Sequence, residues 1–306
     1  MEDREKIHAV NRMQEYIEAH IHEEITLQEL SAAAGYSPYH ALRVFKELTD
    51  QTPFSFIRAI RLTKAVEALR DPNQRIVNIA LGAGFDSHDG FTRAFSKRFG
   101  LTPQKYRQET PAIFCFTYTP IAYYYEHVKN GRNCRMEKRM VPSTVTATVI
   151  ERPARKLVLL RSKQATEYFS FCEEVGCEWH GLLDSIPEKL DPPALLTLPA
   201  HLIKEGTSAT ACGVEVPFDY NKSLPEGYEM LDLPPCQMLV FQGMPYEDEG
   251  DFGEALGIVF EAMENYQPER YGYRYADDVA PRFNFGSSAE NGAKMAVPVM
   301  SLDDYD

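Results

Sequence analysis

The sequence predicts a multidomain protein: an all-α domain with two helix-turn-helix units over residues 1–107, followed by an α+β domain over residues 145–306. Three observations predict this division. A helical motif occurs twice within the first 107 residues, and near residue 145 the apolar period changes from that of helices to that of strands. The charge divides as well, because residues 1–107 hold 15 Lys and Arg against 14 Asp and Glu, whereas residues 108–306 hold 17 against 31.

Basic residues concentrate around the repeated motif, although the whole chain has a formal net charge of −13. Residues 37–107 contain 12 Lys and Arg but 6 Asp and Glu. A local basic surface on an acidic chain indicates a polyanionic partner for that surface alone.

The repeat reads GYSPYHALRVFKELTDQTP at residues 35–53 and GFDSHDGFTRAFSKRFGLTP at residues 84–103. In each copy a helix is expected to end at a glycine, Gly35 or Gly84, which adopts a positive φ without a steric penalty. A serine, Ser37 or Ser87, then stands where a helix N-cap is expected. The spacing of residues 54–70 predicts a connecting helix about 25 Å long, long enough to hold two recognition helices toward neighbouring major grooves.

In each second helix the apolar residues share one face and leave a polar face outward. A solvated helical repeat would show the same periodicity. The recurring turn residues, the arginine at the same outward position and the trailing Thr-Pro favour helix-turn-helix units instead.

Residues 7–107 resemble the DNA-binding region of the AraC/XylS family of bacterial transcription regulators. The second copy matches the family pattern A-x-x-x-G-F-x-S-x-x-x-F-x-R-x-F-x-x-x-x-G-x-x-P-x-x-Y-R from Ala80 to Arg107. The resemblance implies double-stranded DNA as the partner, bound by an outward set: Tyr39, Leu42, Arg43, Lys46, His88, Asp89, Thr92, Arg93 and Lys97. Two departures are expected to loosen the first unit: Ala41 replaces a larger apolar residue, and Asp50 replaces a glycine.

Residues 108–144 are expected to be a linker. Its aromatic residues favour a packing seam between the two domains over a ligand-binding surface. The basic run around residues 132–139 predicts a solvated segment that contacts phosphate.

From residue 145 onward, strand-like and helix-like segments occur in two halves that align at a single offset of 81 residues. Pro153 aligns with Pro234, Trp179 with Phe260, and Pro217 with Pro298. The alignment predicts a duplicated strand-helix-strand-strand unit, with both copies in one sheet and a groove where they meet.

This region resembles the GyrI-like effector-binding domain, through ERPARKLVLLR, VGCEWHGLL, GVEVPF and DLPPCQMLVFQG. The resemblance implies a groove for a small hydrophobic or aromatic effector, with a ligand-binding set of Trp179, Glu215, Phe260, Tyr273 and Phe283. Members often carry a glutamate four residues before the proline of the last strand, where this chain has Lys294. If Lys294 faces the groove, it opposes a cationic ligand; if it faces solvent, Glu215 is left free.

Three functions remain open at this point. The first is a transcription regulator that responds to a hydrophobic effector and controls multidrug efflux or detoxification. The second is a hydrolase of small electrophiles that uses Trp179 and Glu215, and the third is a domain that binds a protein such as RNA polymerase. We expect no cofactor and no metal, because the trio Cys172, Cys177 and His180 fits no zinc pattern. No apolar run reaches the roughly 18 residues of a membrane helix, so a cytoplasmic location is expected.

Overall fold

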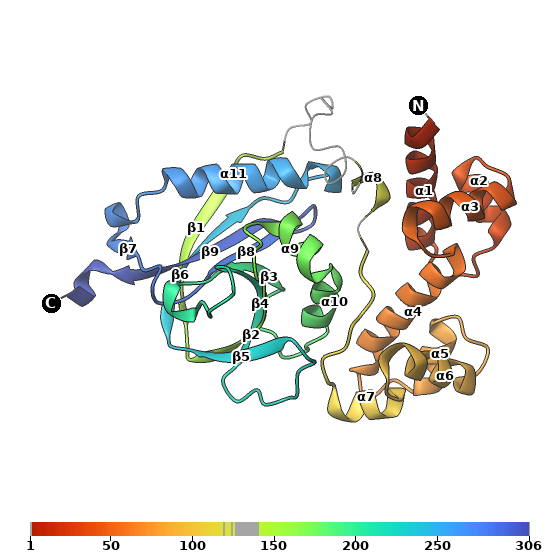
Figure 1. Ribbon diagram of the computed structural model, residues 1–306, viewed down its shortest axis with the longest axis horizontal. Coiled ribbons are helices and arrows are strands. Elements are labelled where there is room, and N and C mark those ends of the chain that lie inside the picture. The colour runs from red at the N-terminus through yellow and green to blue at the C-terminus, as the bar shows by residue number, and fades with distance from the viewer. Residues whose placement is uncertain (1, 119, 124, 126–140, 306) are drawn as a thin grey trace. The chain divides into compact units, whose positions relative to one another are not determined.

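The computed structural model describes residues 2–118, 120–123, 125 and 141–305, and the chain divides into two compact units, Met1–Cys134 and Arg135–Asp306 (Figure 1). The described part of the first is helical, and the second is built on an antiparallel sheet.

The first unit consists of two helical groups joined by one long helix. Its helices are α1 (Glu2–Ala19), α2 (Leu27–Ala34), α3 (Pro38–Thr49), α4 (Pro53–Leu69), α5 (Ile76–Gly82), α6 (His88–Phe99), α7 (Pro103–Glu109) and the short α8 (Ile121–Tyr123). Figure 1 shows α4 running from the group of α1, α2 and α3 to the group of α5, α6 and α7. The predicted connecting helix is therefore confirmed.

Helix α4 contributes side chains to two separate apolar cores. Its Phe56 and Ile57 are buried with α1, α2 and α3, and its Leu62 and Val66 are buried with α5, α6 and α7. Because one rigid helix belongs to both cores, the two helix-turn-helix units have a fixed separation.

The turn chemistry of the two copies agrees with the sequence except at one serine. Gly35 and Gly84 take positive φ values of 71° and 73°. Ser87 caps α6, since its hydroxyl accepts from the backbone N–H of Gly90 at 3.1 Å. Ser37 occupies the N-cap position of α3 but its side chain makes no capping hydrogen bond. Pro38, the first helical residue, presets φ there, so this helix start does not depend on the serine oxygen.

Asp50 takes the conformation of the glycine that it replaces. Its φ is 58°, and its backbone N–H donates to the carbonyl of Lys46 at 3.0 Å. Gly100 closes α6 in the same way with a φ of 76°. The first helix-turn-helix unit therefore keeps its geometry. The cost is the steric strain of a Cβ in the left-handed region.

Residues 108–118 and 120–122 of the predicted linker lie in the first unit, whereas Val141 is buried in the core beneath α11 of the second unit. The backbone N–H of Phe116 donates to Thr63 Oγ1 at 2.9 Å, and the N–H of Ile121 donates to Gln14 Oε1 at 2.9 Å. The rings of Phe116 and Tyr118 lie edge-on to Phe56. This aromatic run thus completes the core of α1 and α4; its role as a seam between domains stays a prediction, and the basic run around residues 132–139 lies outside the described residues.

The described residues of the second unit form a nine-stranded antiparallel sheet. Its strands are β1 (Val145–Arg152), β2 (Arg155–Arg161), β3 (Ala194–Thr197), β4 (Thr210–Pro217), β5 (Tyr228–Leu233), β6 (Cys236–Gly243), β7 (Tyr273–Tyr275), β8 (Arg282–Ser288) and β9 (Gly292–Ser301). The order is β1-β6-β9-β8-β3-β4-β2-β5, and β7 pairs with β9. Its α-helices are α9 (Tyr168–Val175), α10 (Glu178–Asp184) and α11 (Phe252–Asn265); short 3-10 helices occupy Ala200–Leu202, Glu249–Asp251, Pro268–Tyr271 and Leu302–Tyr305.

The two predicted halves do share one sheet, and they join where β3 pairs with β8. The predicted repeat of strand-helix-strand-strand is incomplete, because each half begins with a further strand. These first strands are exchanged: β1 pairs with β6 of the second half, and β5 pairs with β2 of the first. The exchange ties the halves together at both edges of the sheet.

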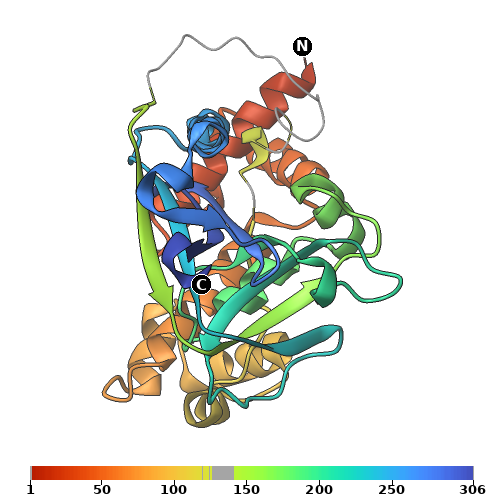
Figure 2. The same cartoon turned by 90° about the vertical axis from the view of Figure 1, so that its left-hand side faces the viewer.

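The sheet has two different faces. In β9, Met295 and Val297 pack under α11, whereas Ala296 between them belongs to the core on the other side. Figures 1 and 2 show α11 lying across one face of the sheet. The face away from α11 is lined by apolar residues of both halves, including Leu157 and Phe283.

Candidate nucleic-acid interface

Helix α3 presents an outward face that carries the predicted residues of the first unit. Tyr39 is 79% exposed, Arg43 and Lys46 are exposed, and Leu42 is half-buried. The opposite side of the helix is buried through Ala41, Val44 and Phe45. Arg43 lies 3.3 Å from His40 Nδ1 through its Nη2 atom, so the guanidinium is oriented from within its own helix.

Helix α6 presents the matching face of the second helix-turn-helix unit. Asp89 has a side chain that is 92% exposed and lies 3.6 Å from the ring of His88. Arg93 and Lys97 are exposed, and within the described part of the chain neither forms an ion pair. Their charge is therefore available to a polyanion.

Thr92 is predicted to lie on the outward face of α6, but the structure places it only partly there. It is half-buried, and its Oγ1, like Ser96 Oγ one turn later, is buried without a hydrogen-bond partner among the described residues. The outward face of α6 therefore consists mainly of His88, Asp89, Arg93 and Lys97.

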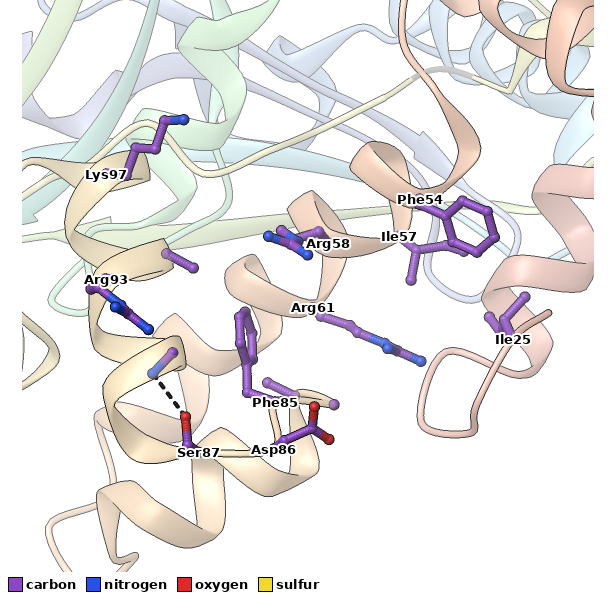
Figure 3. A pocket seen from close by; sticks show the side chains of 14 residues that line it. Ile25, Phe54, Ile57, Arg58, Arg61, Phe85, Asp86, Ser87, Arg93 and Lys97 are labelled. Carbon is purple, nitrogen blue, oxygen red and sulfur yellow. Dashed lines mark hydrogen bonds between the residues drawn. The ribbon is translucent and has the colours of Figure 1, made fainter. Parts of the chain in front are cut away.

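A cleft of about 560 Å³ separates the two helix-turn-helix units. Figure 3 shows Arg58 and Arg61 reaching from α4 and Arg93 and Lys97 from α6, with Asp86 at the turn before α6. Four cations and one carboxylate give this cleft a positive charge. Anions are therefore its complementary ligands.

Arg61 binds α4 to the first helix-turn-helix unit, and its guanidinium lies beside Gly84 of the second. Its Nε donates to the carbonyl of Ile21 at 2.9 Å, and its Nη2 donates to the carbonyl of Glu23, both in the loop that precedes α2. A Cβ built on Gly84 would lie 2.4 Å from Arg61 Nη1. Gly84 is thus required twice, for its positive φ and for the space that the guanidinium occupies.

Sequence reasoning missed the residues of α4 in this cleft. Arg58 is exposed, lies over the ring of Phe85 at 5.9 Å and points into the space between the units (Figure 3). Arg58 and Arg61 are three residues apart on one helix face, and this i, i+3 spacing was the available signal. Some of the basic residues of this unit stabilise the fold instead of lining the cleft. Arg107, for example, donates to the carbonyls of Leu69 at 3.2 Å and Gln74 at 2.8 Å.

The five predicted ligand residues of the second unit do not come together at one place. Trp179 in α10 is 3% exposed and packs edge-on to Phe171 at 5.9 Å. Phe260 on α11 is 46% exposed, and Tyr273 in β7 packs in the core beneath α11. Phe283 lies in the core of the sheet face away from α11.

Glu215 is not a free carboxylate. It is 4% exposed, and its Oε1 accepts from Nε of the fully buried Arg155 at 2.5 Å. Its Oε2 lies 3.6 Å from Arg152 Nε. Arg155 also donates to the carbonyl of Pro234 at 2.9 Å. Glu215 is therefore part of a buried ion pair and not the free carboxylate expected for a solvent-facing Lys294, and its role in ligand binding stays a prediction.

Lys294 points neither to Glu215 nor freely into solvent. Its Nζ lies 2.5 Å from Asp191 Oδ1 and 4.6 Å from the centre of the Phe285 ring. Asp191 also pairs with Arg152, so one network of hydrogen-bonded charges joins the two halves of the sheet. Sequence reasoning missed Asp191 because it lies in the loop before β3, 103 positions from Lys294.

The described residues contain no group of three or more His, Cys, Asp or Glu side chains placed to hold a metal ion. No helix within the described ranges is long and apolar enough to cross a membrane.

Comparison with known proteins identifies relatives of the first unit. A family described as "Helix-turn-helix domain" matches residues 30–109. The probable transcription factor PqrA of Proteus vulgaris is 34% identical over 111 residues, which cover 35% of this chain and 91% of that protein. The transcriptional regulator Rob of Salmonella typhimurium is 42% identical over 95 residues, which cover 31% of this chain and 33% of Rob. This chain thus matches about a third of the length of Rob.

Two solved structures show weaker likeness. A transcriptional regulator of Chromobacterium violaceum, described by its AraC-type DNA-binding domain, is 26% identical and covers 33% of this chain and 90% of that one, with a TM-score of 0.32. A protein bound to tetraphenylphosphonium is 14% identical and covers 52% of this chain and 97% of that one, with a TM-score of 0.36. Both scores are too low to assign a function to either unit. The relatives with shared sequence are named as transcription factors and regulators, and they lend no support to the hydrolase alternative.

Proposed function

We propose a function for this chain on the basis of its family. The chain belongs to the AraC family of helix-turn-helix DNA-binding transcription regulators. We infer that its first unit binds duplex DNA with α3 and α6 in neighbouring major grooves and thereby regulates transcription. One observation carries the proposal: two equivalent helices with exposed basic faces are joined by α4, which belongs to the core of each unit. Such a pair fits successive major-groove faces, about 34 Å apart along DNA.

Within this proposal, base reading and backbone anchoring fall to different arginines. Arg93 projects from the exposed face of α6, where an arginine pairs bidentately with guanine O6 and N7. Arg58 and Lys97 line the cleft between the two units, where the DNA backbone crosses from one major groove to the next. We assign these two side chains to phosphate contacts, which fix register without reading sequence.

The test separates the two roles by affinity and salt dependence. A cognate site is first selected from random duplexes with the full-length protein. Arg93→Ala is expected to cost about 1–3 kcal/mol at that site and to relax one base preference. Arg58→Ala is expected to weaken cognate and random DNA alike and to lower the salt slope by roughly 1.

Lys163→Ala is the matched control, because it removes one exposed positive charge from the second unit. It should leave both affinities unchanged. If Arg93→Ala weakened cognate and random DNA equally, Arg93 would be a phosphate contact. If the wild-type protein selected no site, the function itself would be refuted.

We further propose that the second unit binds a neutral or anionic aromatic effector, and that this effector tunes regulation of efflux or detoxification genes. The supporting observation is the charge network on the sheet face away from α11, since Glu215 and Asp191 are each held by cations. An ion pair that is already satisfied gains little from a further charge. Two partly buried apolar side chains of that face, Val240 and Phe285, would contact the aromatic ring.

Calorimetric titration of the full-length protein with a neutral planar aromatic compound and a cationic dye of similar size tests this preference. The neutral compound should bind at least as tightly as the dye. Lys294→Ala removes one cation of the network and should raise the affinity for the dye. Tight dye binding that is indifferent to Lys294→Ala but lost in Glu215→Gln would show that Glu215 is the ligand carboxylate after all. A role of this unit in binding RNA polymerase stays an untested alternative.

A further inference from the structure

Two cysteines meet where α9 gives way to α10 in the second unit. Cys172 lies in the last turn of α9, and Cys177 is the N-cap residue of α10. Gly176 between them takes a φ of 79°, and its N–H donates to the carbonyl of Cys172 at 2.9 Å. This sharp joint turns the chain back between the two cysteines and brings the thiols close enough for each to shift the pKa of the other. Cys172 is half-buried and Cys177 is exposed, so reagents reach the pair from solvent.

The surroundings of Cys172 favour its thiolate. The hydrogen bond from the Cys177 thiol, followed by donors on Trp179 and Tyr168, lowers the pKa of Cys172 to about 7 despite partial burial, which acts in the opposite direction. The indole N–H of Trp179 is buried and has no hydrogen-bond partner among the described residues, so its dipole is free to favour the nearby thiolate. Glu167 is the charged group that opposes the thiolate.

The other described cysteines lack these features. Cys115 and Cys212 are buried. Burial raises the pKa of the Cys212 and Cys236 thiols. Because the thiolate is the nucleophile, Cys172 is the reactive thiol of this set. At pH 7, a thiol of pKa about 7 is roughly fifteen times more ionised than an ordinary cysteine of pKa about 8.5.

We propose that Cys172 and Cys177 are a reaction site for hydrogen peroxide. Their oxidation forms a disulfide bond that links α9 to α10. The Cys172 thiolate attacks one peroxide oxygen, the O–O bond breaks, and the departing hydroxide takes a proton to become water. Cys172 is then a sulfenic acid. The sulfur of Cys177 attacks it, the S–O bond breaks, and the Cys177 proton leaves with the hydroxyl as a second water. The two sulfurs lose two electrons in total, and peroxide gains them.

The disulfide would change the packing around the helix joint. Trp179 follows Cys177 by two residues and lies edge-on to Tyr168 at 6.4 Å and to Phe171 at 5.9 Å. Trp179 is also the only tryptophan of the chain, so its emission reports on this joint. The reaction requires neither DNA nor effector. This proposal is therefore independent of the proposed regulation.

The experiment treats the reduced full-length protein with one equivalent of hydrogen peroxide. We expect a loss of two of the six free thiols, a loss of the mass of two hydrogens, and a peptide in which Cys172 is joined to Cys177. Dithiothreitol should restore both thiols. The rate should rise with pH through about 7 as Cys172 ionises.

Three variants locate the chemistry. Cys172→Ser should slow peroxide consumption at least about tenfold at pH 7, in line with its excess of thiolate. Cys177→Ser should leave a sulfenic acid that dimedone traps on Cys172. Cys236→Ser, the control at another half-buried thiol, should react like the wild-type protein. A disulfide between other cysteines, unchanged kinetics in Cys172→Ser with native Trp179 emission, or no thiol loss in the wild-type protein would each overturn the proposal.

Discussion

Replacing Gly84 by alanine tests how much the hydrogen bonds of Arg61 stabilise the first unit. The new Cβ meets two obstacles. Gly84 has a φ of 73°, a backbone conformation that costs an L-residue about 1–2 kcal/mol. The Cβ would also lie 2.4 Å from Arg61 Nη1 and 3.0 Å from its Cζ, so the guanidinium must move.

The displacement has a structural cost that can be estimated. Arg61 donates from Nε to the carbonyl of Ile21 and from Nη2 to the carbonyl of Glu23. Each hydrogen bond from a charged donor contributes about 1 kcal/mol when it is partly exposed. We therefore expect Gly84→Ala to destabilise the first unit by about 3 kcal/mol and Arg61→Ala by about 2 kcal/mol. The double variant should lose about 3 kcal/mol rather than 5, because the alanine no longer displaces a side chain.

Gly100→Ala is the matched control. Its φ of 76° equals that of Gly84 within a few degrees, but no atom lies within 4 Å of the added Cβ. It should cost only about 1 kcal/mol, the backbone contribution. Urea unfolding of the full-length protein is followed by circular dichroism, to which the helices of both units contribute, and by Trp179 emission, which reports on the second unit alone and so separates the two transitions.

Equal losses in Gly84→Ala and Gly100→Ala would refute the steric part of this reasoning. Additive losses in the double variant would refute the coupling between Arg61 and Gly84. A shift of the Trp179 transition in any of these variants would show that the unfolding of the two units is coupled.

Three further changes test the remaining features. Glu215→Gln should cost the second unit about 3 kcal/mol, because it leaves the fully buried Arg155 without its counter-charge; Glu215→Leu combined with Arg155→Met should unfold near the wild-type urea concentration. Asp50→Gly should stabilise the first unit by about half a kcal/mol, since the relief of a left-handed Cβ exceeds the added freedom of the unfolded chain. Glu174 accepts hydrogen bonds from three backbone N–H groups and from the Ser162 hydroxyl. These bonds lower the pKa of Glu174 from 4.5 to about 2, and the N–H of Lys163 makes the largest contribution. Its stabilising contribution is present above pH 4.5 and lost as pH falls toward 2, so Glu174→Gln should flatten the acid limb of a stability curve measured by Trp179 emission.

The first unit was predictable because its determinants are local. A glycine with positive φ, the capping serine of α6 and apolar residues at helical spacing lie within a few positions of the turn that they specify. Thr52 and Thr102 also cap their helices in the same way, each accepting at 3.2 Å from the N–H three residues later. Arg61 acts on carbonyls about 40 positions earlier, and no local pattern marks such a partner.

In the second unit, the duplication predicted which segments correspond but not which strands pair. The offset of 81 maps Arg155, the first residue of β2, onto Cys236, the first residue of β6. It is silent on the exchange of β1 and β5, because two identical halves pair their first strands equally well within or between themselves. Only the folded sheet selects β1 with β6 and β5 with β2.

The same limit explains why the sequence did not predict the ion pair of Glu215. Glu215 stands opposite Leu157 in the register of β4 and β2, and Arg155 is the diagonal neighbour, within reach of a long side chain. A carboxylate beside a buried guanidinium becomes its counter-charge before it can serve a ligand. Lys294 adds a further cation to the same face. It forms an ion pair with Asp191, which lies in another loop. With three cations around two carboxylates, the charge left over on this face is positive, which is why the selection of a cationic ligand does not follow from the presence of Glu215.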